Sequence, residues 1–163
     1  MNEWVDAAVL GVHLFSAVLF VGGSFFMWLV LEPVSHRVTT DEAARTLLVG
    51  RIARRFGQLT TPLLVVLIVT GLYNATWYLP SLASPLSTLG GQVLVVKAVA
   101  VAVLVALVYT HGLYFGRRIG RLAREGKVDA LRQIRRKSRL VAYANLGLML
   151  AILALAVVLQ MVG

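Results

Sequence analysis

Two histidines and one lysine lie inside long apolar stretches of this sequence. His13 lies in the first such stretch, and Lys97 and His111 lie near the two ends of "VLVVKAVAVAVLVALVYTHGLYF". Ionisable groups in hydrocarbon are costly, so residues of this kind commonly face a bundle interior and act in function. A neutral imidazole can ligate haem iron or carry a proton near neutral pH. These three residues are therefore the first candidates for a functional site.

Each of the three residues has a functional interpretation and a structural one. His13 is the preferred haem or metal ligand, or it is a packed histidine bonded to Asn74 or to a backbone carbonyl. His111 is a second ligand or a proton carrier, or it belongs to an aromatic belt at the membrane interface. Lys97 holds a carboxylate or assists proton removal, or its ammonium group reaches out to the membrane surface.

A second set of residues could support a bound cofactor. A flat porphyrin needs glycine along its faces, and Gly22 and Gly23 are the candidates, although close helix packing also explains glycines in membrane spans. Arg54 and Arg55 could hold carboxylates at the cytoplasmic face, where anionic lipid is an alternative partner. The candidate metal ligands are His13, His111 and Met27, and the candidate cofactor-binding residues are His13, His111, Gly22, Gly23, Asn74, Arg54 and Arg55.

Several other chemistries lack the residues that they require. The sequence has no cysteine, which excludes disulfides, thiolate metal sites and thiol redox chemistry. Copper(I) favours Cys and Met, and the four methionines form no paired motif, so a dedicated copper site is the weaker prediction. The spans contain no carboxylate pair, and the chain has no glycine-rich phosphate loop, which argues against hydrolase and nucleotide sites.

The elements that must position these residues are four membrane-spanning helices. The 163 residues are 59% hydrophobic with a mean hydropathy of +0.82, whereas apolar usage averages nearer ~45–50%. Spanning a bilayer takes about 20 predominantly apolar residues, and four runs reach that length: 4–31, 59–79, 92–115 and 140–162. These runs leave no room for a separate soluble domain, so residues 1–163 are predicted to form one integral membrane domain.

The basic residues predict the topology. Of the 16 lysines and arginines, five lie in the predicted loop 32–58 and ten in the predicted loop 116–139. Loops rich in Lys and Arg stay in the cytoplasm, so both chain termini are expected outside a plasma membrane. The net charge of +9 fits attraction to anionic lipid, and no motif supports nucleic-acid binding.

Local signals predict where the helices begin and end. Pro33 disfavours a regular helix and is expected to end the first span. The segment "TTDEAARTLLVGRIARRFGQ" has the pattern of an amphipathic interfacial helix, capped by Thr40 or Asp41. The third helix should extend and break at Gly126, and Asp129 should cap a short basic helix. Short connections favour an all-α, up-and-down four-helix bundle, a shape that often forms homo-oligomers.

The depths of the polar residues predict two separate layers. With span centres near residues 17 and 103, His13 lies about 6 Å and Lys97 about 9 Å toward the outside. His111 lies about 12 Å toward the cytoplasm. The two histidines are therefore about 18 Å apart along the membrane normal, too far to be the two axial ligands of one haem.

Three segments of the sequence resemble two membrane families that are themselves similar. The segments are "HLFSAVLFVGGSFF", "RRFGQLTTPLLVVLIVTGLYNA" and "GQVLVVKAVAVAV" followed by "YTHGLYFGRR", and the families are the CopD-like and HemJ-type proteins. "FVGGSFF" and "RRFGQL" with "VTGLYNA" are more similar to the CopD-like family. The lysine early in the third span and "THGLYFGRR" are more similar to the HemJ type.

The two resemblances imply different functions. HemJ-type proteins bind b-type haem and oxidise protoporphyrinogen IX to protoporphyrin IX, relying on intramembrane His and Lys, and His13, Lys97 and His111 match these residues by position. CopD-like proteins are associated with copper uptake or tolerance.

We expect from these observations a membrane protein that binds haem b. It would move electrons between a porphyrin-like or quinol donor and the membrane pool, with Lys97 and His111 as the candidate catalytic residues. A porphyrinogen oxidation removes protons together with hydrides or electrons, so it needs a base beside an electron acceptor. Two alternatives stay open: CopD-like copper transport or tolerance, and a subunit of a membrane complex without an active centre.

Overall fold

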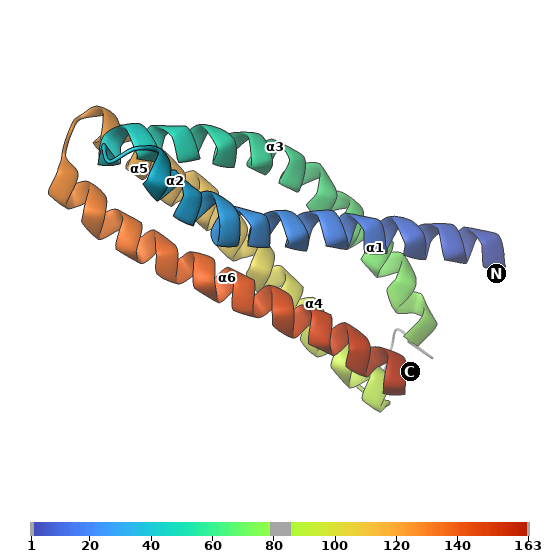
Figure 1. The fold of residues 1–163 in the computed structure, drawn as a ribbon. Coiled ribbons are helices and arrows are strands. Elements are labelled where there is room, and N and C mark those ends of the chain that lie inside the picture. The colour runs from blue at the N-terminus through green and yellow to red at the C-terminus, as the bar shows by residue number, and fades with distance from the viewer. Residues whose placement is uncertain (1, 79–85, 163) are drawn as a thin grey trace.

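The structure is a computed structural model, and it describes residues 2–78 and 86–162. All of its regular elements are helical, as Figure 1 shows. The helices are α1 (Glu3–Phe26), α2 (Glu32–Val38), α3 (Glu42–Ala75), α4 (Leu89–Thr110), α5 (Arg117–Arg124) and α6 (Val128–Val162). π-Helical segments join α1 to α2 (Met27–Leu31) and α4 to α5 (His111–Gly116), and a 3₁₀ turn (Thr76–Tyr78) follows α3. The all-α prediction is confirmed.

Four continuous helical rods are long and apolar enough to cross a membrane. They cover Glu3–Val38, Glu42–Ala75, Leu89–Arg124 and Val128–Val162. Rods of 34 to 36 residues are about 50 Å long, whereas the hydrocarbon core is about 30 Å thick, so their basic ends extend beyond it. The protein is a multi-pass membrane protein, as predicted, while the predicted end of the second span at Leu79 lies outside the described residues.

The prediction that Pro33 ends the first helix is wrong. The backbone passes from α1 through Met27–Leu31 into α2, and the Glu32 N–H donates to the Met27 carbonyl, five residues back. In a regular α-helix the Pro33 ring would meet the Leu29 carbonyl and would leave it without a donor. Leu29 lies within the wider π turn, which gives the Pro33 ring room beside the Leu29 carbonyl, so the helical rod continues.

The segment predicted as a separate interfacial helix is instead the first part of α3, a single helix of 34 residues. Asp41, rather than Thr40, is the cap, and its carboxylate accepts from the Ala43 and Ala44 amides at 2.8 and 3.3 Å. The prediction was wrong because no strong breaker separates the amphipathic part from the span. Leu47 packs against the core at this end of the molecule, which holds the amphipathic part in the bundle.

The turn after α5 follows the prediction, but the start of α6 does not. Gly126 has a φ of +65°, a left-handed conformation that glycine adopts without steric cost, and the Lys127 amide donates to the Leu122 carbonyl at 3.2 Å. Asp129 caps no separate short helix, because α6 runs unbroken from Val128. The basic segment and the fourth span form one rod.

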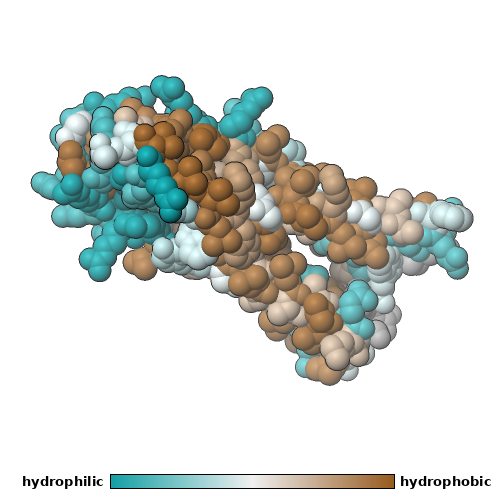
Figure 2. All heavy atoms as spheres, viewed as in Figure 1, coloured by the Kyte–Doolittle hydropathy of each residue, from teal (hydrophilic) through white to brown (hydrophobic). Residues whose placement is uncertain are grey.

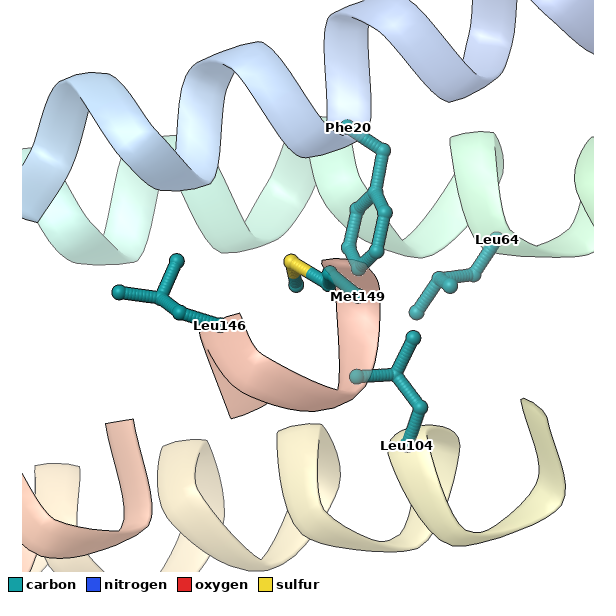
Figure 3. Close-up of a cluster of buried hydrophobic side chains, with 5 residues drawn as sticks. All are labelled: Phe20, Leu64, Leu104, Leu146 and Met149. Atoms are coloured by element: carbon teal, nitrogen blue, oxygen red, sulfur yellow. The ribbon is translucent and has the colours of Figure 1, made fainter. Parts of the chain in front are cut away.

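The four rods pack as two antiparallel pairs, α1 with α3 and α4 with α6 (Figure 1). A middle core draws on all four rods (Figure 3) and consists of Phe20, Leu64, Leu104, Leu146 and Met149. A second core consists of Leu122, Ala123, Leu131 and Ile134, where α5 packs against α3 and α6. We name the end of the bundle that holds this second core the basic end, and the opposite end, where α1 begins and α6 ends, the terminal end.

The surface divides along the length of the molecule. Figure 2 shows apolar side chains over much of the rods and hydrophilic side chains gathered at the basic end. Large apolar residues stand outward from the rods, among them Phe15, Leu72 and Val157, each more than 60% exposed. Such exposure suits contact with lipid chains rather than water.

Candidate functional site

His13 projects from α1 against α3, where Thr70 holds its ring. The distance from His13 Nδ1 to Thr70 Oγ1 is 2.8 Å. The Thr70 hydroxyl also lies 2.6 Å from the Val66 carbonyl, to which it can donate its single hydrogen. When that bond is made, the Thr70 oxygen accepts from His13, so the imidazole proton lies on Nδ1 and the lone pair of Nε2 is available as a ligand.

Two neighbouring α3 residues complete the surroundings of His13. A Cβ added at Gly71 would lie 3.2 Å from His13 Cε1, tighter than most real contacts, so glycine here allows the ring to approach the helix. Asn74, predicted as a partner of His13, does not bond to it. Thr70 lies one turn nearer the middle of the bundle and takes that position, while Asn74 Oδ1 is buried without a partner among the described residues.

Lys97 of α4 is the other ionisable residue predicted for the His13 layer. Among the described residues it has neither a carboxylate nor a hydrogen-bond partner. In its ammonium form Lys97 would oppose a cation at His13 Nε2 and favour an anionic group. The placement of Lys97 beside His13 stays a prediction, and its chemical consequence depends on the sign of the ligand's charge.

A hydrogen bond joins α1 to α3 near the terminal end. The Tyr73 hydroxyl donates to Asp6 Oδ1 at 2.7 Å, and the Tyr73 ring packs edge-on against Trp77 with centroids 6.2 Å apart. The sequence analysis did not single out Asp6 or Tyr73 as site residues. The spacing in the sequence could have indicated Asp6, because it precedes His13 by seven residues and so lies on the same face of the helix.

His111 lies on the other side of the middle core, at the start of the π-helical segment His111–Gly116. Its Nε2 is 3.5 Å from Ser138 Oγ of α6, and its ring is tilted against Phe115 with centroids 5.7 Å apart. Its Nδ1 is buried and has no partner among the described residues. One ring nitrogen is thus free to take a proton or an ion, and π turns occur frequently at functional positions.

The middle core separates the two histidines. Leu104 lies seven residues from Lys97 and seven from His111, about 10 Å along α4 in each direction. Phe20 lies seven residues beyond His13 on α1. The two predicted layers are therefore present, and the histidines cannot ligate one ion or one haem together. Nor do the described residues contain a cluster of three or more His, Cys, Asp or Glu that could hold a metal.

Met149 is the donor that the sequence analysis missed. Its side chain is 4% exposed in the middle core, and Figure 3 shows its sulfur beside Phe20 and Leu146. The search for a paired methionine motif passed over it because no second methionine accompanies it. A single buried thioether is a common core filler, yet it is also a soft metal donor.

Four predicted binding residues line one shallow groove rather than the His13 layer. The groove has a volume of about 390 Å³ between α1 and α3, and Gly22, Gly23, Met27 and Arg55 are among its lining residues. His13 is not among them, since it precedes Gly22 by nine residues, about 14 Å of helix. The structure therefore does not bring the two glycines and His13 together around one flat cofactor.

The members of this groove have different local roles. A Cβ at Gly23 would lie 2.5 Å from Phe56 Cε2, so Gly23 serves helix packing, whereas nothing lies within 4 Å of a Cβ at Gly22. Arg55 donates to Gln58 at 3.2 Å. Arg54 is exposed and does not line the groove.

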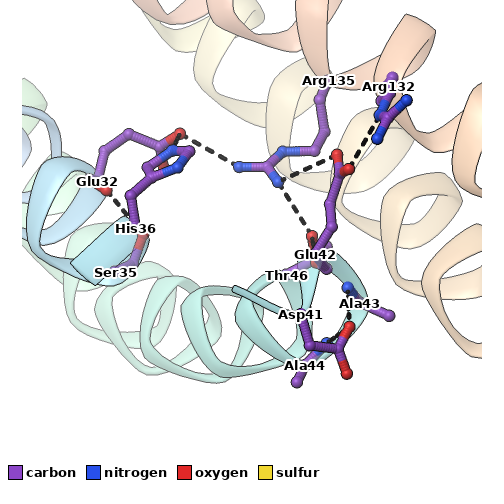
Figure 4. Close-up of polar contacts among 10 residues, drawn as sticks. All are labelled: Glu32, Ser35, His36, Asp41, Glu42, Ala43, Ala44, Thr46, Arg132 and Arg135. Carbon is purple, nitrogen blue, oxygen red and sulfur yellow. Dashed lines mark hydrogen bonds and ion pairs between the residues drawn. The ribbon is translucent and has the colours of Figure 1, made fainter. Parts of the chain in front are cut away.

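An ionic network joins three helices at the basic end (Figure 4). Arg135 of α6, only 14% exposed, lies 3.2 Å from Glu32 and 3.8 Å from Glu42, and Arg132 donates to Glu42 at 3.0 Å. His36 lies 3.6 Å from Glu32, and its side chain is 47% exposed, so it lies at the edge of the network. The sequence does not predict this network, because arginines in such loops are already explained by the topology of the protein.

Comparison with known proteins identifies a family. The family model copper resistance protein D (CopD) matches residues 50–159, more than half of the chain, from the first part of α3 through most of α6. No curated protein and no solved structure matches the chain. The matched region includes Thr70, Lys97, Met149 and His111 but not His13, and the resemblance to the HemJ type stays a prediction. The chain belongs to the copper resistance protein D family.

Proposed function

We propose that the protein binds copper ions within the membrane and passes them from one face to the other. The observation that carries the proposal is the orientation of His13, whose Nδ1 proton is held by Thr70 so that Nε2 remains a ligand inside the bundle. Imidazole suits copper, and a hydrogen bond to the other ring nitrogen orients ligating histidines in this way. Membership of the CopD family supports the choice of metal.

Donor side chains lie at three successive levels of the bundle. His13 lies toward the terminal end, Met149 lies in the middle core, and His111 lies toward the basic end with Nδ1 unpartnered. Copper(I) accepts both imidazole and thioether donors. The ion would be cargo that moves from level to level, with neutral donors replacing its water and with no change of oxidation state.

Lys97 would set how tightly the ion is held. Its positive charge, predicted for the same layer as His13, would weaken copper binding there without removing the ligand. Transport requires binding that is favourable enough to admit an ion and weak enough to release it. A like charge beside the first ligand meets the second requirement.

The test is copper(I) uptake into vesicles that contain the purified protein and an internal copper-sensitive dye. His13→Gln should slow uptake by roughly tenfold or more, because the loss of a ligand or its support commonly costs 10–100-fold. His36→Gln is the matched control, since His36 is exposed at the basic end. Uptake no faster than in empty vesicles, or equal loss in both variants, would contradict the proposal.

A second candidate function is haem-dependent redox chemistry, and Lys97 favours it. The His13 imidazole, with Nδ1 against Thr70, would bind haem iron through Nε2, and the Lys97 ammonium group, predicted for the same layer, would hold a carboxylate of the porphyrin. Haem bound there would supply one-electron chemistry. His13 would bind the iron, Lys97 would orient the carboxylate, and the apolar helices would exclude water, while His111 lies too far away to be the second ligand.

Lys97→Gln distinguishes the two candidates by the direction of its effect. If the ligand is a bare copper ion, removal of a like charge should raise the affinity several-fold; if it is an anionic haem, the affinity should fall. The measurements are copper(I) titration against a chromogenic chelator and reduced-minus-oxidised visible spectra of the purified protein. A colourless protein whose copper affinity falls in Lys97→Gln would contradict both candidates.

A further inference from the structure

A groove at the basic end carries four arginines. Its lining residues are Leu113, Tyr114, Arg117, Arg118, Arg121 and Arg124, and its volume is about 460 Å³. The four arginines are exposed, and they span about 10 Å along α5. Neither His13 nor His111 lines this groove, and it takes no part in the copper function proposed above.

The orientation of the groove is determined by packing on the other face of the same helix. Leu122 and Ala123 are buried in the second core, and Phe115 and Ile119 pack against it. With one face of α5 held against α3 and α6, the arginine face must point away from the bundle. The arginines are therefore presented by a rigid element rather than by a mobile loop.

The charge of the groove is largely unneutralised. One carboxylate, that of Glu125, pairs with an arginine of the groove. A hydrogen bond from Lys127 holds the pKa of this carboxyl below its ordinary value, with the charges of Lys127 and Arg121 acting in the same direction. Glu125 stays ionised but lies 2.9 Å from Lys127 and 3.8 Å from Arg121. Among the described residues, no carboxylate pairs with Arg117, Arg118 or Arg124.

The groove has an apolar side nearer the middle of the membrane and a cationic side farther from it. This order matches the acyl chain and the charged headgroup of a lipid. Leu113 and Tyr114, each about half exposed, precede the arginines and lie nearer the middle of the membrane. Arg118 donates to the Tyr114 hydroxyl at 3.0 Å and lies over its ring. Guanidinium groups pair well with phosphate oxygens, and an acyl chain would lie along the apolar side.

We propose that this groove binds the phosphate headgroup of an anionic phospholipid in the leaflet at the basic end. The same chemistry would recognise a soluble phosphate compound, but the adjacent Leu113 and Tyr114 and the position of α5 at the end of a membrane rod favour a lipid. A bound headgroup would hold the α4–α5 rod at a fixed depth. The positive-inside rule places this leaflet on the cytoplasmic side.

The test is lipid retention by the whole purified protein, measured by native mass spectrometry after exchange into mixed phosphatidylglycerol and phosphatidylcholine vesicles. The unaltered protein should retain phosphatidylglycerol in preference. The variant Arg117→Gln/Arg118→Gln/Arg121→Gln should lose at least about tenfold of that preference, because each basic residue near a membrane surface contributes substantially to anionic-lipid binding. No preference in the unaltered protein would overturn the proposal without any variant.

The matched control is Arg136→Gln/Lys137→Gln/Arg139→Gln, which removes the same charge from exposed positions of α6 outside the groove. Its lipid preference should remain, and an equal loss in both variants would overturn the proposal by showing a general charge effect. The variant Arg117→Lys/Arg118→Lys/Arg121→Lys, which keeps the charge, should retain part of the preference. Displacement of phosphatidylglycerol by inorganic phosphate alone would assign the groove to a soluble ligand and would also overturn the lipid proposal.

Discussion

At the scale of single residues, Thr70 determines which nitrogen of His13 can act. The Thr70 hydroxyl has one hydrogen, and the Val66 carbonyl takes it. The His13 Nδ1–H must then donate to Thr70, and Nε2 is left with its lone pair. Polar side chains inside helices commonly bond to their own backbone, and here that local bond decides the chemistry of a residue 57 positions away.

Thr70→Val tests this dependence. Valine has nearly the same shape but cannot accept from Nδ1, so the tautomer and the ring orientation are no longer held. Copper(I) affinity should fall by about tenfold, in line with the loss of second-sphere partners elsewhere. A competitive titration against a copper(I) chelator measures the change.

Thr61→Val is the control for this substitution. Thr61 lies on the same helix, and its hydroxyl bonds only to the Gly57 carbonyl at an exposed position, at 3.1 Å. It should leave the copper affinity unchanged. Equal affinities in the two variants would show that Thr70 does not position His13.

At the scale of elements, the basic-end network joins rods that the membrane alone would not align. Arg135 lies between Glu32 of α2 and Glu42 of α3, with both carboxylates partly buried. Removal of one partner leaves buried charge uncompensated, which is usually more costly than the pair was stabilising. The network therefore restrains the relative positions of α2, α3 and α6.

Arg135→Met should destabilise the fold by about 2 kcal/mol, a value reduced from that of a fully buried pair because the carboxylates remain partly exposed. Arg136→Met, at an exposed neighbouring position, should have little effect. Thermal unfolding in detergent, followed by circular dichroism at neutral pH, measures both. Identical midpoints would mean that the network does not contribute to stability.

The helix ends show which local signals could be read in advance. The Asp41 cap and the Gly126 turn were predictable, because each depends on the chemistry of one or two residues. Pro33 was misread, because a π turn can accommodate a proline that a regular helix cannot. The merging of the amphipathic segment into α3 was also missed, since only packing at the second core shows that it stays in the bundle.

At the scale of the whole molecule, the proposed orientation places the basic end in the cytoplasm of a cell with this protein in its plasma membrane. The absence of native cysteine makes this directly testable. In intact cells a membrane-impermeant maleimide should label Asn2→Cys, at the terminal end, and should not label Arg136→Cys, at the basic end, until the cells are permeabilised. Labelling in the reverse pattern would show that the topology is the opposite of the predicted one.

The predicted homo-oligomer is tested separately, by size analysis of the purified protein in detergent.

The four apolar rods, the basic connections at one end of the bundle and the separation of the two histidines all follow from local properties of the sequence. Hydropathy, charge distribution and the constant rise of a helix are properties of each segment alone, so they can be read without knowing its neighbours. The separation of His13 from His111 follows from the same arithmetic. These features needed no knowledge of which helix faces which.

The partners of those residues become visible only in the packed bundle. Thr70 rather than Asn74 holds His13, and Met149 lies between the two histidine layers. Arg135 meets the carboxylates of Glu32 and Glu42, which are 103 and 93 positions away. These pairings depend on how each rod is rotated about its axis. In a membrane, both the lipid-facing and the inward-facing sides of a helix are apolar, so the sequence carries little signal of rotation, and close packing sets it instead.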